Sequence, residues 1–189
     1  MRELVFLLEE LSAQAMLEGL LPNLLPQAAT VRYLVFEGKS DLEKQLVRKV
    51  KGYRNPEARF VVLRDQDSAP DCLVIKAKIV ALCANAGKSD VLVRIACREL
   101  ESFYLADLAA VEKGLVLTGL AKHQGKQKFR NPDYLGSPSR ELATLTKGRY
   151  QKVGGSRAIG PWLDPNNTRS DSFRNLVAGI QKISEEFAS

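Results

Sequence analysis

The sequence predicts an α/β fold built on a parallel sheet of about four strands, with helices on both faces. Short apolar segments alternate with segments whose apolar residues recur at helical spacing, and this order occurs four times before residue 112. Strands that alternate with helices pair in parallel through right-handed crossovers. Acidic residues also follow three of the apolar segments. In a parallel sheet, such positions lie along one edge.

Four short segments predict the strands. Residues 4–8 are apolar and end before two glutamates, which is typical of a buried strand. Residues 31–36 are rich in β-branched and aromatic side chains. Residues 60–63 and 91–96 are mainly apolar and complete the set. Each segment has the length of one strand and is short for a helix.

The first two helices are predicted from an apolar stripe and its end signals. Ser12 is expected to cap the first helix, which Pro22 and Pro26 end. Ser40 is expected to cap the second helix, which ends at Gly52.

Two further helices follow the later strands. Residues 72–86 carry apolar side chains at helical spacing, and Gly87 is suited to the position just after the helix end. Residues 101–111 are expected to form the fourth helix.

The strand-and-helix pattern weakens after residue 111. Pro138 is expected to open a short helix, whereas Gly154 and Gly155 are expected in a loop. A second loop is expected at residues 161–167. Residues 170–187 have the apolar stripe of an amphipathic C-terminal helix.

We therefore expect a core at residues 1–120 and a basic, loop-rich elaboration at residues 121–189 packed on it, within a single domain overall. The net charge of the 189 residues is +6, and residues 122–174 hold eleven lysines or arginines against four acids. The rest of the chain has a net charge of −1. This segment either faces a polyanion or is the solvated surface of an ordinary basic protein.

Composition limits the cellular setting. Cys72, Cys83 and Cys97 are widely spaced and match neither a metal-binding spacing nor a disulfide framework. We expect reduced thiols, two of them buried, in a cytoplasmic protein. No apolar run approaches the roughly 20 residues of a membrane helix. Acids interrupt the first apolar run early, which argues against a secretory signal.

The acids at the strand ends indicate chemistry. Asp65 and Asp67 follow the third strand and, two residues apart, leave an extended backbone on the same side. Glu9 follows the first strand, and Glu99 and Glu101 follow the fourth. Clustered carboxylates repel one another unless a cation neutralises them, and oxygen ligands suit Mg²⁺ or Mn²⁺. Such a site can hold two ions for in-line displacement at phosphorus.

Three motifs carry a resemblance to a known superfamily: residues 6–10 (FLLEE), 64–67 (RDQD) and 98–102 (RELES). This layout resembles the Toprim domain, a Rossmann-like fold of topoisomerases, primases and small nucleases. The whole chain also resembles an uncharacterised family of small Toprim-like proteins, related to the overcoming-lysogenization-defect nucleases and often encoded beside ATPases.

The resemblance implies catalytic acids at Glu9, Asp65, Asp67 and Glu101. The same four, with Glu99 as a second ligand or a structural partner, would bind Mg²⁺ or Mn²⁺. Two departures stand out: Glu10 replaces the usual glycine after the first acid, and Ala13 stands where the nuclease branch often has another acid. Residues 37–41 (EGKSD) copy the first motif more literally, but would leave no strand between them and Asp65.

The function expected from the resemblance is a metal-dependent nuclease acting on DNA or RNA. The alternative is a non-catalytic nucleic-acid-binding or regulatory subunit of an ATPase-containing system, with the ATPase encoded separately. Basic residues in the C-terminal third are expected to contact the phosphate backbone without reading sequence. Around Phe129 they also suit a stacked base. The expected nucleic-acid-binding residues are Lys126, Lys128, Arg130, Lys152 and Arg157.

Overall fold

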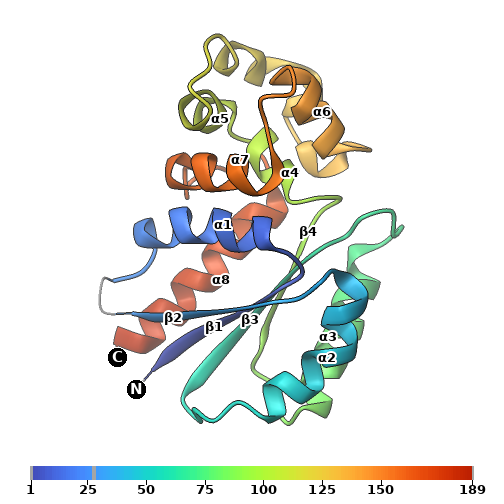
Figure 1. Cartoon of the computed structure of the whole chain (residues 1–189), viewed down its shortest axis with the longest axis vertical. Helices are drawn as coiled ribbons and strands as arrows, with labels where there is room; N and C mark the ends of the chain where they lie inside the picture. Colours follow the sequence, from blue (N-terminus) through green and yellow to red (C-terminus); the bar gives the residue numbers. More distant parts are fainter. Residues whose placement is uncertain (1, 27–28, 189) are drawn as a thin grey trace.

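The computed structural model describes residues 2–26 and 29–188. Its centre is a four-stranded sheet in the order β2-β1-β3-β4, with every neighbouring pair parallel (Figure 1). The predicted fold class is confirmed. The strands are β1 (Glu3–Leu8), β2 (Thr30–Val35), β3 (Ala58–Asp65) and β4 (Leu92–Ala96).

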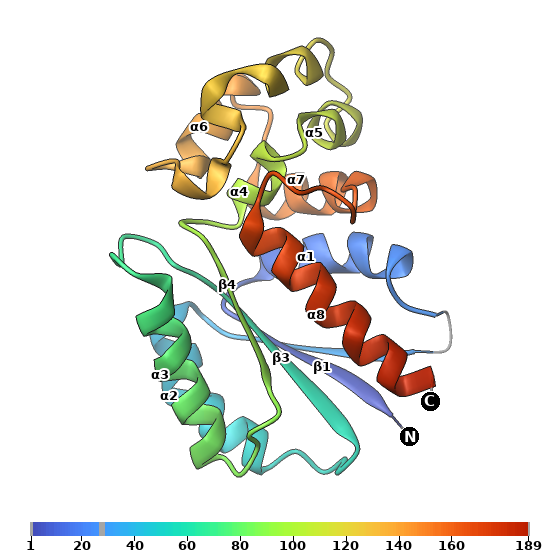
Figure 2. The same cartoon turned by 180° about the vertical axis from the view of Figure 1, so that it is seen from behind.

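Helices cover both faces of the sheet. Helices α1 (Leu11–Leu20) and α8 (Asp171–Ala188) lie on one face, and α2 (Lys39–Lys51) and α3 (Cys72–Asn85) lie on the other (Figures 1 and 2). Side chains alternate along each strand, so each strand supplies two separate cores. Every residue of β1 is buried, which explains why residues 4–8 are apolar without alternation.

The two cores divide the strand residues between them. Leu4, Phe6 and Leu8 pack toward α1 and α8, whereas Val5 and Leu7 pack toward α2 and α3. The first core extends beyond the sheet, because it also includes buried residues of the helices that follow β4.

A layer of short helices lies beyond the carboxyl ends of the strands (Figures 1 and 2). This layer contains most of the basic segment, and α8 then returns along the sheet. No helix in the described part of the chain is long and apolar enough to cross a membrane. The α-helices of the layer are α4 (Glu101–Leu105), α5 (Leu108–Gly114), α6 (Pro138–Leu145) and α7 (Lys152–Ile159). Within the described residues, the 3₁₀ turns are Leu21–Asn23, Ala121–Gly125, Gln127–Phe129, Pro132–Tyr134 and Gly160–Trp162.

Both predicted N-caps were wrong. Glu10 precedes α1, and Ser12 is already in its first turn, only 1% exposed. Gly38 precedes α2 with a φ of +95°, a conformation that glycine adopts without strain. The predicted helix over residues 101–111 is divided in two, because the side chain of Asp107 accepts a hydrogen bond from the Ala110 amide and starts α5.

The loop predicted at Gly154 and Gly155 was also wrong, since both lie inside α7. A Cβ atom on Gly155 would overlap the ring of Tyr150, so the glycine allows the helix to pack closely on that ring. Gly155 is therefore required for close packing of a helix and does not form a turn, and the neighbouring residues in the sequence do not distinguish these two roles.

Candidate active site

Glu9 and Asp65 are neighbours because their strands are neighbours. Leu8 of β1 pairs with Leu63 of β3, so the residues that follow emerge side by side. The Asp65 amide donates a hydrogen bond of 3.2 Å to Oε2 of Glu9. The first two predicted acids therefore meet at the carboxyl edge of the sheet.

Asp67 lies in a tightly bonded turn after β3. Its amide donates to the Arg98 carbonyl at 2.6 Å, and the Gln66 amide donates to the Ala96 carbonyl at 2.9 Å. The Arg98 amide in turn donates to Oε1 of Gln66 at 3.1 Å. Asp67 and Arg98 have φ angles of +56° and +63°, a left-handed conformation that is unfavourable for residues other than glycine. Two strained residues thus face each other where β3 and β4 end.

Glu101 approaches from the start of α4. The residue is 1% exposed, and its Oε1 accepts a hydrogen bond of 2.8 Å from the Tyr150 hydroxyl. Tyr150 comes from the segment between α6 and α7, so the helical layer supplies a donor to the acid at the end of β4. The ring of Tyr150 lies 5.8 Å from that of Tyr104.

The pKa shifts of these carboxylates arise partly from one another's charges. Burial, followed by the charges of Glu101 and Glu9, raises the pKa of Asp65 well above its usual value. Burial and then the charge of Asp67 raise the pKa of Glu9. Burial also raises the pKa of Glu101, although the Tyr150 hydrogen bond opposes that shift. The four predicted catalytic acids therefore form one electrostatically connected group.

Two lysines face this group. Nζ of Lys39, in the first turn of α2, lies 2.8 Å from Oδ2 of Asp67. Nζ of Lys152, at the start of α7, lies 2.6 Å from Oε1 of Glu10. Burial lowers the pKa of Lys152, but its hydrogen bond to Glu10 and the nearby acids outweigh that effect and raise it. Each lysine is about half exposed, so both ammonium groups remain accessible from solvent.

Glu99 holds a different position. Its Oε2 accepts a hydrogen bond of 2.6 Å from the Ser139 amide in the first turn of α6, where a negative charge also favours the helix dipole. Glu99 and Asp67 line the same cavity of about 410 Å³ at the sheet edge. The remaining lining residues of this cavity are Lys39, Ser68, Arg98 and Gly136.

The donor chemistry of the group fits a hard divalent cation, because every candidate ligand is a carboxylate. The arrangement fits less well. Among residues 2–26 and 29–188, no three His, Cys, Asp or Glu side chains form a group that could hold a metal ion. Asp67 is engaged by Lys39, and Glu101 by Tyr150. Cation binding at this edge would require at least one of these acids to change partner.

The predicted nucleic-acid contacts separate into two groups. Lys152 lies at the carboxylate group, whereas Lys126, Lys128, Arg130 and Arg157 are exposed elsewhere on the helical layer. Nζ of Lys128 is bonded to Glu141 at 2.5 Å and lies 5.0 Å from the Phe129 ring.

The predicted base-stacking surface was wrong. Phe129 is 0% exposed, because it packs into the core that joins the helical layer to the sheet. A ring in that position cannot stack on a base.

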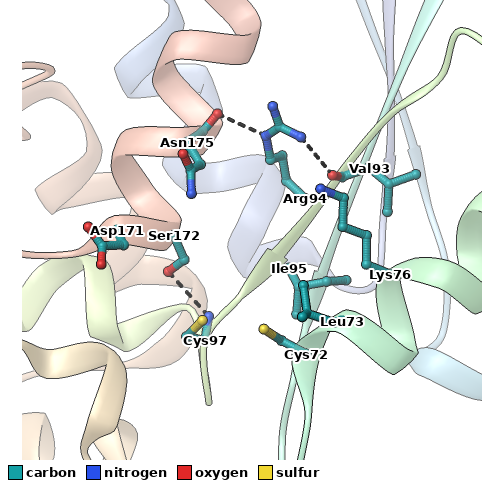
Figure 3. A pocket seen from close by; sticks show the side chains of 10 residues that line it. All are labelled: Cys72, Leu73, Lys76, Val93, Arg94, Ile95, Cys97, Asp171, Ser172 and Asn175. Carbon is teal, nitrogen blue, oxygen red and sulfur yellow. Dashed lines mark hydrogen bonds between the residues drawn. The ribbon is translucent and has the colours of Figure 1, made fainter.

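The cysteines were partly mispredicted. Cys83 alone is buried; Cys72 and Cys97 are partly exposed, and all three are free thiols. Cys72 and Cys97 line a separate cavity of about 350 Å³ between α3, β4 and α8, where their side chains turn toward each other (Figure 3). Burial and the charge of Asp133 raise the pKa of Cys97 to about 12, so this thiol stays protonated.

Sequence reasoning missed Lys39 and Tyr150. The signal for Lys39 was present in residues 37–41, since the Gly38 amide donates to the Glu9 carbonyl at 2.9 Å and brings α2 to the site. No local signal identifies Tyr150, which lies 49 positions after Glu101.

The family described as "Domain of unknown function (DUF4276)" matches residues 8–181. The chain belongs to this DUF4276 family. Among curated proteins, none matches the sequence.

Solved structures of OLD proteins share the fold of this DUF4276 chain. The C-terminal region of the Burkholderia pseudomallei OLD protein has a TM-score of 0.54 at 15% identity, with 97% of this chain and 99% of that chain covered. The C-terminal region of the Xanthomonas campestris pv. campestris OLD protein has a TM-score of 0.53 at 12% identity, covering 100% and 98%. At such low identity, the likeness extends to the fold alone.

Proposed function

We propose that this protein is a metal-dependent phosphodiesterase of the Toprim superfamily that cleaves DNA or RNA. The single observation that carries the proposal is the convergence of acids from three strand ends at one edge of the sheet. Glu9 accepts a hydrogen bond from the Asp65 amide, and Glu101 and Asp67 add their charges to the same group. The fold shared with the C-terminal region of an OLD protein also supports the proposal.

The proposed cation is Mg²⁺ or Mn²⁺. Glu9, Asp65 and Asp67 would hold it, with Glu101 as a further ligand, once Lys39 or Tyr150 releases its acid. When bound, such a cation activates water and stabilises negative charge on a phosphate. The hydrogen bonds of Gln66 and Arg98 hold the turn of Asp67 in a strained conformation, which favours a fixed position for its carboxylate.

Basic side chains would position the substrate. Lys39 and Lys152 are half exposed beside the acids, where their ammonium groups can contact a phosphate next to the one that is cleaved. Lys126, Arg130 and Arg157, exposed on the helical layer, would extend the contact to neighbouring phosphates. Contacts of this kind hold the backbone without selecting a sequence.

The proposal is tested by cleavage of supercoiled plasmid and single-stranded RNA with Mg²⁺ or Mn²⁺, comparing wild type with Asp65→Asn. Asp90→Asn is the matched control, because Asp90 precedes β4 at the opposite edge of the sheet and pairs with Arg59 at 3.3 Å. We expect cleavage by wild type and Asp90→Asn, and a loss of about a thousandfold or more in Asp65→Asn. Cleavage that survives Asp65→Asn would contradict the site.

A second candidate function is a non-catalytic nucleic-acid-binding or regulatory subunit that works with a separately encoded ATPase. The observation that favours it is that protein groups already engage the acids: Lys39 bonds Asp67, and Tyr150 bonds Glu101. Calorimetric titration with Mn²⁺ separates the two functions. Nucleic-acid binding without Mn²⁺ binding, undiminished when Asp65→Asn and Asp67→Asn are combined, would favour the subunit.

A further inference from the structure

Two cysteines face each other outside the candidate active site. Cys72 is the first residue of α3, and Cys97 directly follows β4. Both line the cavity of about 350 Å³ between α3, β4 and α8, and their side chains turn toward each other there (Figure 3). Both also line a second cavity of about 240 Å³. Both thiols are free and partly exposed, so small molecules can reach the pair.

The two sulfur atoms are close enough to interact. Burial and then the charge of Asp133 raise the pKa of Cys97, and the charge of Cys72 and a hydrogen bond with it add to that shift. A disulfide requires side chains that point toward each other across a short distance. Cys83 is excluded from the pair, because it is buried 11 positions after Cys72 and therefore about 16 Å further along α3.

Hydrogen bonds fix the backbone of both cysteines. The side chain of Asp71 accepts a hydrogen bond of 2.7 Å from the Leu73 amide and starts α3. The Cys97 amide donates to Oγ of Ser172 at 3.3 Å, and the Cys97 carbonyl accepts a hydrogen bond of 2.7 Å from the Ser102 hydroxyl. A covalent bond between the cysteines would therefore join α3 to the starts of α4 and α8.

The turn of Asp67 lies between the two cysteines. The chain runs from this turn directly into α3, which Cys72 begins. The Asp67 amide also donates to the carbonyl of Arg98, the residue after Cys97, at 2.6 Å. A bond between Cys72 and Cys97 would close a short ring through this hydrogen bond, so the turn would open less often.

We propose that Cys72 and Cys97 form a reversible disulfide that fixes the turn of Asp67 to the start of α3. The oxidant is a small disulfide that carries carboxylates. The Cys72 thiolate attacks one of its sulfur atoms and releases one thiol. The Cys97 sulfur then attacks Cys72, releases the second thiol and gives its proton to solvent. Two protein thiols are oxidised and one small disulfide is reduced to two thiols, so the electrons balance.

The surroundings of Cys72 favour this reagent. Lys76 and Arg94 line the larger cavity and attract carboxylates. The acid of that cavity, Asp171, is paired with Arg174 at 2.8 Å. The N-terminus of α3 also stabilises negative charge on the attacking sulfur. The proposal is independent of the proposed catalytic function, because neither cysteine is a candidate ligand.

Oxidised glutathione is the probe for the test, applied to the full chain under native conditions at pH 8. Wild type is expected to lose two hydrogens, which intact mass spectrometry measures, and peptide mapping is expected to link Cys72 to Cys97. Cys97→Ser should retain one glutathione on Cys72, and Cys72→Ser should form no disulfide within the chain. Cys83→Ala is the matched control and should oxidise like wild type.

The oxidised chain should also be more stable. Its melting temperature is expected to rise by about 7–14 °C, because the ring over residues 72–97 restricts the unfolded chain, and a dithiol reductant should reverse the change. Hydrogen exchange at the Asp67 amide, measured by nuclear magnetic resonance, should slow on oxidation.

Several results would overturn the proposal. Wild type that stays reduced, that keeps glutathione on Cys72, or that links Cys83 or a second chain would exclude the pair. An oxidised chain that melts no higher than the reduced chain would show that the native geometry does not accommodate the bond. Unchanged hydrogen exchange at Asp67 would exclude the effect on the turn. The wild-type peptide map decides the pairing even where a variant fails to fold.

Discussion

Removing the Tyr150 hydroxyl tests how the helical layer supports the candidate site. Tyr150→Phe deletes the donor that lies 2.8 Å from Glu101, an acid that is 1% exposed. A hydrogen bond to a charged group contributes about 1.5–3 kcal/mol, and the buried carboxylate has no water to replace it. At about 2–4 °C per kcal/mol for a chain of this size, the melting temperature should fall by about 3–12 °C at pH 8.

The loss should depend on pH. Burial raises the pKa of Glu101 above its usual value, so the folded protein holds a proton that the unfolded chain releases between the two pKa values. Stability therefore falls as pH rises through that interval. Without the Tyr150 hydroxyl the folded pKa rises further and the interval widens. The loss of unfolding free energy in the variant should be smaller at pH 5, where more of the Glu101 side chains carry a proton, than at pH 8, where the bare carboxylate is left without its donor.

Tyr104→Phe is the matched control for this measurement. Tyr104 is fully buried beside Tyr150, and its hydroxyl has no hydrogen-bond partner among the described residues. Removing it should be neutral or stabilising. Urea unfolding of both variants in EDTA, at pH 5 and pH 8, gives the comparison. Equal effects of the two substitutions, or a Tyr150→Phe loss that is the same at both pH values, would refute the assigned role of the hydrogen bond.

Two further predictions concern the backbone. Asp67 has a φ of +56°, so Asp67→Gly should be about 1 kcal/mol more stable than Asp67→Ala in thermal unfolding; equal stabilities would argue against strain at this turn. Gly155→Ala should destabilise the fold by about 1–3 kcal/mol because the new methyl group meets Tyr150, whereas Gly154→Ala, with open space at its Cβ, should be neutral or stabilising. Similar urea midpoints for the two alanine variants would contradict the close packing.

The sheet was predictable because its strands are buried on both faces. A strand that is buried on both faces has an unbroken apolar run, as at residues 4–8 of β1. This pattern can be recognised in the sequence without knowledge of the tertiary contacts. Helices α3 and α8 were predictable for a similar reason, since their apolar spacing extends over 14 and 18 residues. The starts of α1 and α2 were not, because the backbone around Glu10 and Gly38 is shaped by the neighbouring strand ends.

The acids of the candidate site were predictable, and their partners were not. Parallel pairing alone brings Glu9 and Asp65 to one edge, so position in the sequence was sufficient. Tyr150 reaches Glu101 only through the packing of α7, which depends on Gly155 and on the core that the helical layer shares with the sheet. Contacts of this kind are tertiary and leave no periodic signal in the sequence. The prediction that Phe129 is exposed was wrong for the same reason, because its burial depends on that core.

The distribution of unfavourable features is itself an argument for function at the sheet edge. Most of the fold follows local rules: buried strands are apolar, and α8 presents an apolar stripe to the sheet. Several exceptions meet where β3 and β4 end, although Val116 and Lys147 of the helical layer also have positive φ angles. At these strand ends, Asp67 and Arg98 adopt left-handed conformations, and the buried acid Glu101 and the partly buried acid Asp65 raise the free energy of the folded state. A fold selected for stability alone would have an apolar residue in place of Asp65. It would also have no use for the hydrogen bonds that fix the turn of Asp67, because there would be no site for that carboxylate to serve. Retaining the acids together with the bonds that fix them is what a site for a positively charged ligand requires.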